Sequence, residues 1–150
     1  MKTYVIIVSK NYPKKHKKAG DETNFVNKIF DGSKIHTIRS NYELWKKRDN
    51  EVKQGKAIIS LRFWIGKPYK SKQVEFCKLS NYNSIEVQKI FNAVYTQFNT
   101  PDLWLIDDKP YKSKEICHND GLDEDDFVSW FRTYDLSKPM AVIHFTDFRY

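Results

Sequence analysis

The chain has 150 residues, of which 40% are hydrophobic and 30% charged, and its formal net charge is +7. This length is typical of one domain with its own hydrophobic core, so we expect a single domain over residues 1–150. The longest apolar run near the start, residues 4–8, is too short to span a membrane and lacks a signal-peptide cleavage pattern. Two cysteines provide neither a disulfide framework nor a zinc spacing. We therefore expect a cytoplasmic protein without a metal, a cofactor or a membrane partner.

Positive charge is concentrated in the first half of the chain. Residues 1–80 hold 19 Lys and Arg against 7 Asp and Glu, whereas residues 81–150 hold 7 against 12. Such an imbalance favours a polyanionic partner such as RNA or a nucleotide, because basic side chains neutralise phosphate and release counterions. The alternative is that the lysine-rich surface only keeps the protein in solution.

The first predicted elements are a strand, a basic loop and a short helix. Residues 3–9, TYVIIVS, indicate a buried strand, and the loop NYPKKHKKAG follows, whose lysines either contact phosphate or are merely solvated. Apolar spacing over residues 25–30 predicts a helix with one buried face. Asp21 or Thr23 is expected to cap its start, and Gly32 to mark its end.

A short strand and a second helix are expected next. Residues 34–39 are rich in β-branched side chains and predict the strand. Ser40 and Glu43 match a capping box, because each side chain can satisfy a backbone amide at the start of a helix. This helix is expected to continue toward Val52 and to end at Gly55.

Lys34, Thr37 and Arg39 follow Gly32 at regular offsets within this segment. Alternation along a strand places Thr37 and Arg39 on one face and Lys34 on the other. Lys34 can therefore meet Thr37 only if it lies at the irregular glycine junction and curls back. A lysine in a partly closed pocket loses solvation, which lowers its pKa toward the range of a general base. His36 is expected to be a surface or core residue rather than a ligand.

The segment after the second helix predicts a β-hairpin with a basic, aromatic turn. AIISLRFWIG and SKQVEFCKL form its strands, and GKPY forms the turn. The hexapeptide KPYKSK occurs here and once more near the end of the chain, which does not establish a structural repeat. An aromatic ring among lysines can stack on a base, so Lys67, Tyr69 and Trp64 are candidate nucleic-acid contacts. The alternative for Trp64 is a place in the core.

The second half of the chain predicts further strands and one helix with an acidic start. β-Branched and aromatic residues favour a strand from Ile85 to Phe98, and LWLIDDKPY predicts a hairpin turning at Asp107 and Asp108. In NDGLDEDDFVSWFRTYDL the acidic residues fit the first turn of a helix, where the helix dipole favours them without any metal. MAVIHFTDF predicts a final strand. About six or seven mostly antiparallel strands with about three helices predict an α+β domain built on a closed or nearly closed barrel.

The octapeptide GSKIHTIR resembles the Gly-x-Lys-x-x-Thr-x-Arg signature of ASCH domains, members of the PUA-like β-barrel superfamily. The order of predicted elements also matches: a helix precedes the motif, a barrel follows it, and an acidic-capped helix and the strand AVIHF close the chain. The resemblance therefore covers nearly the whole chain. It implies a cleft, lined by the motif, that accepts RNA, a nucleotide or a modified nucleobase, with Lys34 and Arg39 among its contacts.

The resemblance also implies an alternative activity. Some small ASCH proteins are similar to amidohydrolases that deacetylate N4-acetylcytidine, and others look like ribonucleases. Carried over to this chain, Lys34 is the general base, Thr37 the nucleophile and Arg39 an anchor for the substrate or the structure. A hydroxyl needs a base to become nucleophilic, and a desolvated lysine serves in Ser-Lys variants of the catalytic triad.

The family's third catalytic residue is a glutamate shortly before the late helix. The corresponding region here, SKEICHNDG, holds Glu115, His118 and Asp120, of which none aligns cleanly. Glu75, on the predicted hairpin, is the other candidate acid. We therefore expect a binding module, with salt-sensitive affinity and no turnover, and keep the hydrolase as the alternative. A protein-interaction domain is the third class, favoured only if no nucleic acid or nucleoside binds.

Overall fold

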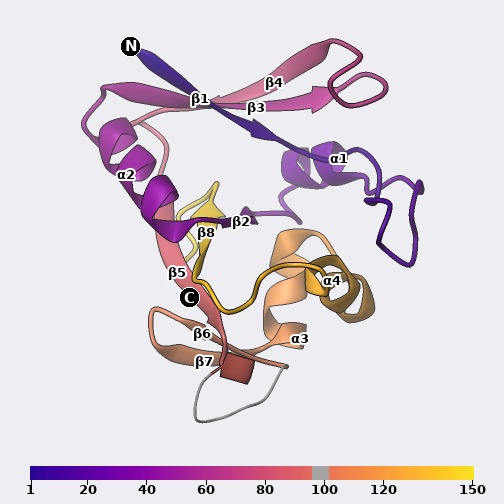
Figure 1. The fold of residues 1–150 in the computed structure, drawn as a ribbon. Coiled ribbons are helices and arrows are strands. Elements are labelled where there is room, and N and C mark those ends of the chain that lie inside the picture. Colours follow the sequence, from indigo (N-terminus) through magenta and orange to yellow (C-terminus); the bar gives the residue numbers. More distant parts are fainter. Residues whose placement is uncertain (96–101) are drawn as a thin grey trace.

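The computed structural model describes residues 1–95 and 102–150. Within them the chain forms a three-stranded sheet in the order β1-β3-β4 and a five-stranded sheet in the order β2-β8-β5-β6-β7. Figure 1 shows the smaller sheet above the larger one, with α2 on one side of the molecule and α1 and α4 on the other. In chain order the elements are β1 (Lys2–Ile7), α1 (Phe25–Phe30), β2 (His36–Ser40), α2 (Tyr42–Lys53), β3 (Ala57–Trp64), β4 (Gln73–Leu79), β5 (Glu86–Asn92), the 3₁₀ helix η1 (Ala93–Tyr95), β6 (Leu103–Ile106), β7 (Lys109–Lys112), α3 (Ser113–Ile116), the 3₁₀ helix η2 (Cys117–Asp120), α4 (Glu124–Phe131) and β8 (Met140–His144).

The α+β class and the predominance of antiparallel pairing are confirmed, but the closed or nearly closed barrel is wrong. β1 pairs with β3 in parallel, whereas the other strand pairs are antiparallel among the described residues. A parallel pair requires a crossover, and here the chain passes through α1, β2 and α2 before it returns as β3. β1 therefore belongs to the smaller sheet, while β2, within the crossover, belongs to the larger one. The described residues thus form eight strands in two sheets with four α-helices.

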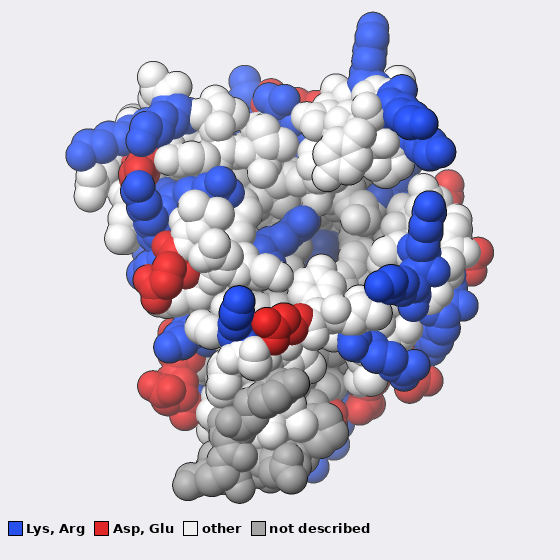
Figure 2. Space-filling model, viewed as in Figure 1, with Lys and Arg blue, Asp and Glu red and all other residues white. Residues whose placement is uncertain are grey.

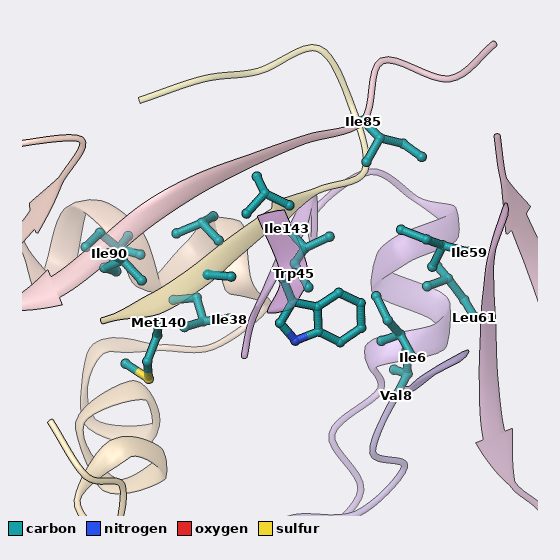
Figure 3. Packing of buried hydrophobic residues seen from close by; sticks show 14 of the residues in the cluster. Ile6, Val8, Ile38, Trp45, Ile59, Leu61, Ile85, Ile90, Met140 and Ile143 are labelled. Carbon is teal, nitrogen blue, oxygen red and sulfur yellow. The ribbon is translucent and has the colours of Figure 1, made fainter. Parts of the chain in front are cut away.

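α2 joins the two sheets through its buried face. The helix contacts β3 of the smaller sheet and β5 and β8 of the larger one. Figure 3 shows Trp45 of α2 between Ile6 and Val8 on one side and Ile38 and Met140 on the other. All five side chains are buried. The hydrophobic core therefore runs continuously between the two sheets. Burial of apolar side chains of this kind is the main favourable contribution to folding.

The helices α1 and α2 end where the sequence predicted, but the residue that precedes the first turn of each helix differs from the prediction. α1 starts after Asn24, and the Thr23 hydroxyl accepts a hydrogen bond from the backbone N–H of Phe25 at 3.2 Å. The capping box predicted at Ser40 and Glu43 is wrong. Asn41 precedes α2 in the left-handed conformation, and its side chain accepts the N–H of Leu44 at 3.1 Å. Asparagine tolerates this conformation better than serine, which explains the shift by one residue.

Gly32 and Gly55 have the positive φ angles expected of residues that follow a helix, +81° and +69°. The strand predicted over residues 3–9 is β1, but the predicted burial is confirmed only in part, since Lys2 and Thr3 are exposed whereas Ile6 is buried. The hairpin of β3 and β4 is confirmed. So is the turn between β6 and β7, where Asp107 and Asp108 have φ angles of +46° and +66°.

The strand predicted from Ile85 to Phe98 is confirmed only as β5, after which the chain turns into η1. Residues 96–98 of that prediction lie outside the described residues. The two copies of KPYKSK differ, since the first forms the turn between β3 and β4 whereas the second forms β7 and begins α3.

The last two elements are α4 and β8, and β8 pairs directly with the motif strand β2. The acidic first turn predicted for this helix is confirmed in α4, where the Asp123 side chain accepts the N–H of Asp126 at 2.8 Å. Phe127 and Phe131 of the same helix are buried. β8 lies between β2 and β5, and all five of its residues are buried. No helix among the described residues is long and apolar enough to cross a membrane.

Candidate functional site

The motif residues line a narrow pocket between β2 and α4, which we call the inner pocket. Its volume is about 70 Å³. Figure 2 shows a hollow near the centre of this face, with Lys or Arg side chains inside it and others around its rim. The polar lining consists of Ser9, Lys34, Thr37, Arg39 and Asp120, and the aromatic lining of Phe25, Trp130, Phe131 and Tyr134.

Lys34 lies before β2, at the irregular junction where a curled side chain was expected. Its ammonium group donates to the backbone oxygen of Asp120 at 2.6 Å and to Oδ1 of the same residue at 2.9 Å. It also lies 4.3 Å from the ring centroid of Phe25, a cation–π contact. Only 3% of Lys34 is exposed. Lys34 and Thr37 thus line one pocket although alternation alone would separate them.

Burial and pairing act in opposite directions on this ion pair. Burial lowers the pKa of Lys34, and the Asp120 carboxylate only partly offsets the shift. For Asp120 burial acts to raise the pKa, but Lys34 and His36 outweigh it, so that the pKa is lowered. The carboxylate is therefore charged at neutral pH. Lys34 loses its proton more easily than an exposed lysine does.

His36 and Tyr150 form a second layer behind Asp120. Nδ1 of His36 lies 3.5 Å from Oδ1 of Asp120, which is longer than a normal hydrogen bond. Nε2 lies 2.7 Å from the Tyr150 hydroxyl, which in turn accepts from Nδ2 of Asn119 at 3.1 Å. Burial lowers the pKa of His36 despite the opposing effect of Asp120. Burial likewise raises the pKa of Tyr150. Both groups are therefore neutral at pH 7.

Thr37 and Arg39 present unused hydrogen-bonding groups. Thr37 is buried, and its hydroxyl has no hydrogen-bond partner among the described residues. Arg39 donates from one terminal nitrogen to the backbone oxygen of Ile7, while its buried Nε has no partner in the described part of the chain. A buried polar group without a partner is unfavourable, so a ligand that accepts from Arg39 gains affinity.

The two predicted glutamates do not reach the inner pocket. Glu75 lies on β4 and bonds the Ser60 hydroxyl and Lys78. Glu115 is exposed and accepts the backbone N–H of Lys112 at 2.7 Å, which caps α3. Both carboxylates therefore have structural partners away from Lys34.

The predicted contacts on the hairpin form a separate surface. Tyr69 is 91% exposed, Lys67 is exposed and Trp64 is half-buried. The rings of Trp64 and Tyr69 lie 5.3 Å apart between centroids. This surface does not line the inner pocket.

Sequence reasoning did not select Asp120, His36 or Tyr150 as site residues. Asp120 was one of three polar residues considered in its segment. Which of them lies next to Lys34 depends on the path of the backbone. The N–H of Ile35 donates to the oxygen of Asn119 at 2.9 Å, which fixes η2 beside the start of β2. For His36 and Tyr150 the sequence holds no local signal.

The chain matches no protein-family model, no curated protein and no solved structure. No cluster of metal-binding side chains exists within residues 1–95 and 102–150. The function must therefore be inferred from the pocket itself.

Proposed function

We propose that the inner pocket binds the base of a nucleotide or of RNA, in keeping with the resemblance to ASCH domains. The observation that carries this proposal is that the pocket is lined both by aromatic side chains and by charged side chains that can form hydrogen bonds. Phe25, Trp130 and Tyr134 offer surfaces against a planar ring. Lys34, Arg39 and Asp120 offer donors and acceptors for its edge.

The pocket's size limits how much of the ligand enters it. A volume of about 70 Å³ is roughly that of two water molecules. Only the polar edge of a ring fits that space, and the sugar must remain outside. Binding therefore depends on a few hydrogen bonds, of which those to Thr37 and Arg39 replace no existing side-chain partner in the described structure.

The β3–β4 turn supplies a second contact for a longer RNA ligand under this proposal. Tyr69 and Trp64 provide stacking surfaces, and Lys67 provides a charge beside them. An RNA strand that contacts both surfaces binds with stronger salt dependence than a single nucleotide does.

The test is a titration of the protein with the four ribonucleosides and with a mixed RNA oligonucleotide, in which changes of the amide chemical shifts report binding. Thr37→Val keeps the shape of the side chain and removes its hydroxyl. We expect it to weaken binding about fivefold, the effect of one hydrogen bond of about 1 kcal/mol. Lys109→Ala, on β7, is the control for an exposed charge. Absence of binding by every ligand would overturn the proposal.

A hydrolase acting on an acylated nucleoside or on RNA is the second candidate, favoured by the Lys34–Asp120 pair. Asp120 supplies the carboxylate that neither Glu75 nor Glu115 can bring to Lys34. With an acylated nucleoside as the substrate, the Thr37 oxygen attacks the acyl carbon, and its proton passes to the unprotonated fraction of Lys34, which burial increases by lowering the pKa of this lysine. The amine leaves with that proton as the C–N bond breaks, and water then hydrolyses the acyl-threonine.

Mass spectrometry separates the two candidates. The protein is incubated with N4-acetylcytidine and with the RNA oligonucleotide, beside Thr37→Val and Thr37→Ser. Hydrolysis that is lost in Thr37→Val and retained in Thr37→Ser establishes the enzyme. Intact substrates together with binding establish the binding module.

A further inference from the structure

The loop between β1 and α1 is fastened to α4 through one buried carboxylate. Nζ of Lys18 lies 2.7 Å from Oδ2 of Asp126, and Nζ of Lys17 lies 3.5 Å from Oδ1. The Tyr12 hydroxyl donates to the same carboxylate at 3.3 Å. Only 2% of Asp126 is exposed. Two of the five lysines in this loop, Lys17 and Lys18, are therefore engaged in holding it.

His16 is also engaged in the loop's own structure. Its Nε2 lies 2.9 Å from the backbone oxygen of Asp126, and its Nδ1 accepts the N–H of Lys18 at 2.9 Å. A carbonyl oxygen only accepts and a backbone N–H only donates, so the imidazole carries its proton on Nε2. Both ring nitrogens are thus used, and the loop has a defined conformation over α4.

Lys14 and Lys15 have no such role. Lys14 and Lys15 are exposed, and neither forms an ion pair or a side-chain hydrogen bond within the described residues. They line a cavity of about 370 Å³, which we call the outer cavity. Its remaining lining is Ser9, Pro13, His16, Ser129, Trp130, Thr133 and Tyr134, without a carboxylate.

The outer cavity adjoins the inner pocket. Ser9, Trp130 and Tyr134 line both. A ligand with one end between these residues and the motif side chains can therefore extend toward the outer cavity.

We propose that the outer cavity binds the phosphate of the ligand, so that the protein acts on phosphorylated nucleotides or RNA rather than on free nucleosides. Two ammonium groups without partners provide the charge that a phosphate requires. The hydroxyl of Thr133 is a further donor in the lining. The absence of an acidic side chain from the lining removes the repulsion that an anion would meet. This inference rests on the proposed base-binding function of the inner pocket.

The experiment compares each ribonucleoside with its 5′- and 3′-monophosphates and with inorganic phosphate, by calorimetry and amide chemical shifts at low salt. We expect one of the monophosphates to bind about tenfold more tightly than its nucleoside. Lys14→Ala/Lys15→Ala should abolish that preference while leaving nucleoside affinity unchanged. Both lysines are exposed, so the variant is expected to fold.

The matched control is Lys109→Ala/Lys112→Ala, which removes the same charge from β7. A preference that survives in Lys14→Ala/Lys15→Ala, or that disappears equally in the control, would overturn the phosphate site. Equal binding of nucleosides and monophosphates would overturn it as well and leave base binding intact. If only inorganic phosphate binds, the base-binding function fails and the phosphate site stands as an anion site.

Discussion

Gly121 packs directly against the side chain of Lys34. A Cβ atom at Gly121 would lie 3.1 Å from Cδ and 3.2 Å from Cβ of Lys34, which is tighter than ordinary van der Waals contact. The same glycine has a φ angle of +80°, and its backbone oxygen accepts from Nζ of Lys28 at 2.7 Å. The position therefore favours glycine for its backbone and for the space it leaves to the lysine.

Gly121→Ala is expected to destabilise the protein through both effects. A left-handed alanine costs about 1–2 kcal/mol, and the crowding of Lys34 adds about 1 kcal/mol or more. Gly20→Ala is the control, because Gly20 has a φ angle of +87° and nothing within 4 Å of a Cβ atom. Urea unfolding measures the difference. Equal losses in the two variants would show that the contact with Lys34 has no effect.

Asp120→Asn should show how much the buried ion pair of Lys34 and Asp120 contributes to the free energy of unfolding. The substitution leaves the Lys34 charge buried without its counterion, and breaking such a pair typically costs about 3–5 kcal/mol. Lys34→Met/Asp120→Asn removes both charges and should recover most of the loss, as a double-mutant cycle would show. Lys138→Met is the control in an exposed pair, where about 1 kcal/mol or less is expected. A small effect of Asp120→Asn alone would contradict a tightly coupled pair.

The part of this site that depends on local sequence could be predicted. Lys34 was expected at the glycine junction because alternation left no other way for it to meet Thr37. Gly32 and the turn at Asp107 were predicted equally well, since their backbone conformations depend on the residues themselves.

Contacts between distant parts of the chain could not be predicted. Asp120 lies 86 positions from Lys34, and the choice among the polar residues near it depends on how η2 lies beside β2. The barrel was wrong for the same reason, because alternation within a strand does not specify its neighbours. β1 and β3 pair in parallel although two helices separate them in the chain, and no residue pattern in either strand indicates this pairing.

Acid should destabilise the protein through His144. Its side chain is fully buried, and burial lowers its pKa from the ordinary 6.5 to about 3. The unfolded chain therefore binds a proton that the folded chain excludes between these values, so stability falls as pH falls below about 6.5. From pH 6.5 to pH 5 the loss is about 2 kcal/mol for one histidine.

His144→Gln should reduce the slope of the profile in this range, measured by urea unfolding at several pH values. Some slope should remain, because burial also lowers the pKa of His36. His118→Gln is the control, because the His118 side chain is exposed and its removal takes away no buried imidazole. A wild-type slope that persists in His144→Gln would assign the acid sensitivity to other groups, of which His36 is the next candidate.

The Asp120 carboxylate should fix the tautomer of the His36 imidazole. The Asp120 carboxylate only accepts, so the Nδ1 atom that faces it at 3.5 Å carries the proton. Nε2 is then an acceptor, and the Tyr150 hydroxyl donates to it at 2.7 Å. We expect the long-range ¹⁵N couplings of His36 to show the Nδ1-protonated form, whereas an Nε2-protonated form would contradict this arrangement.

Tyr150→Phe removes the donor and leaves a buried acceptor without a partner, which costs about 1–3 kcal/mol. The ¹⁵N signal of Nε2 should shift toward that of a free imidazole nitrogen, while Nδ1 keeps its proton because Asp120 still faces it. Tyr82→Phe is the control, because Tyr82 is 94% exposed and its hydroxyl has no partner among the described residues. Unchanged stability and an unchanged Nε2 signal in Tyr150→Phe would mean that His36 is oriented by Asp120 alone.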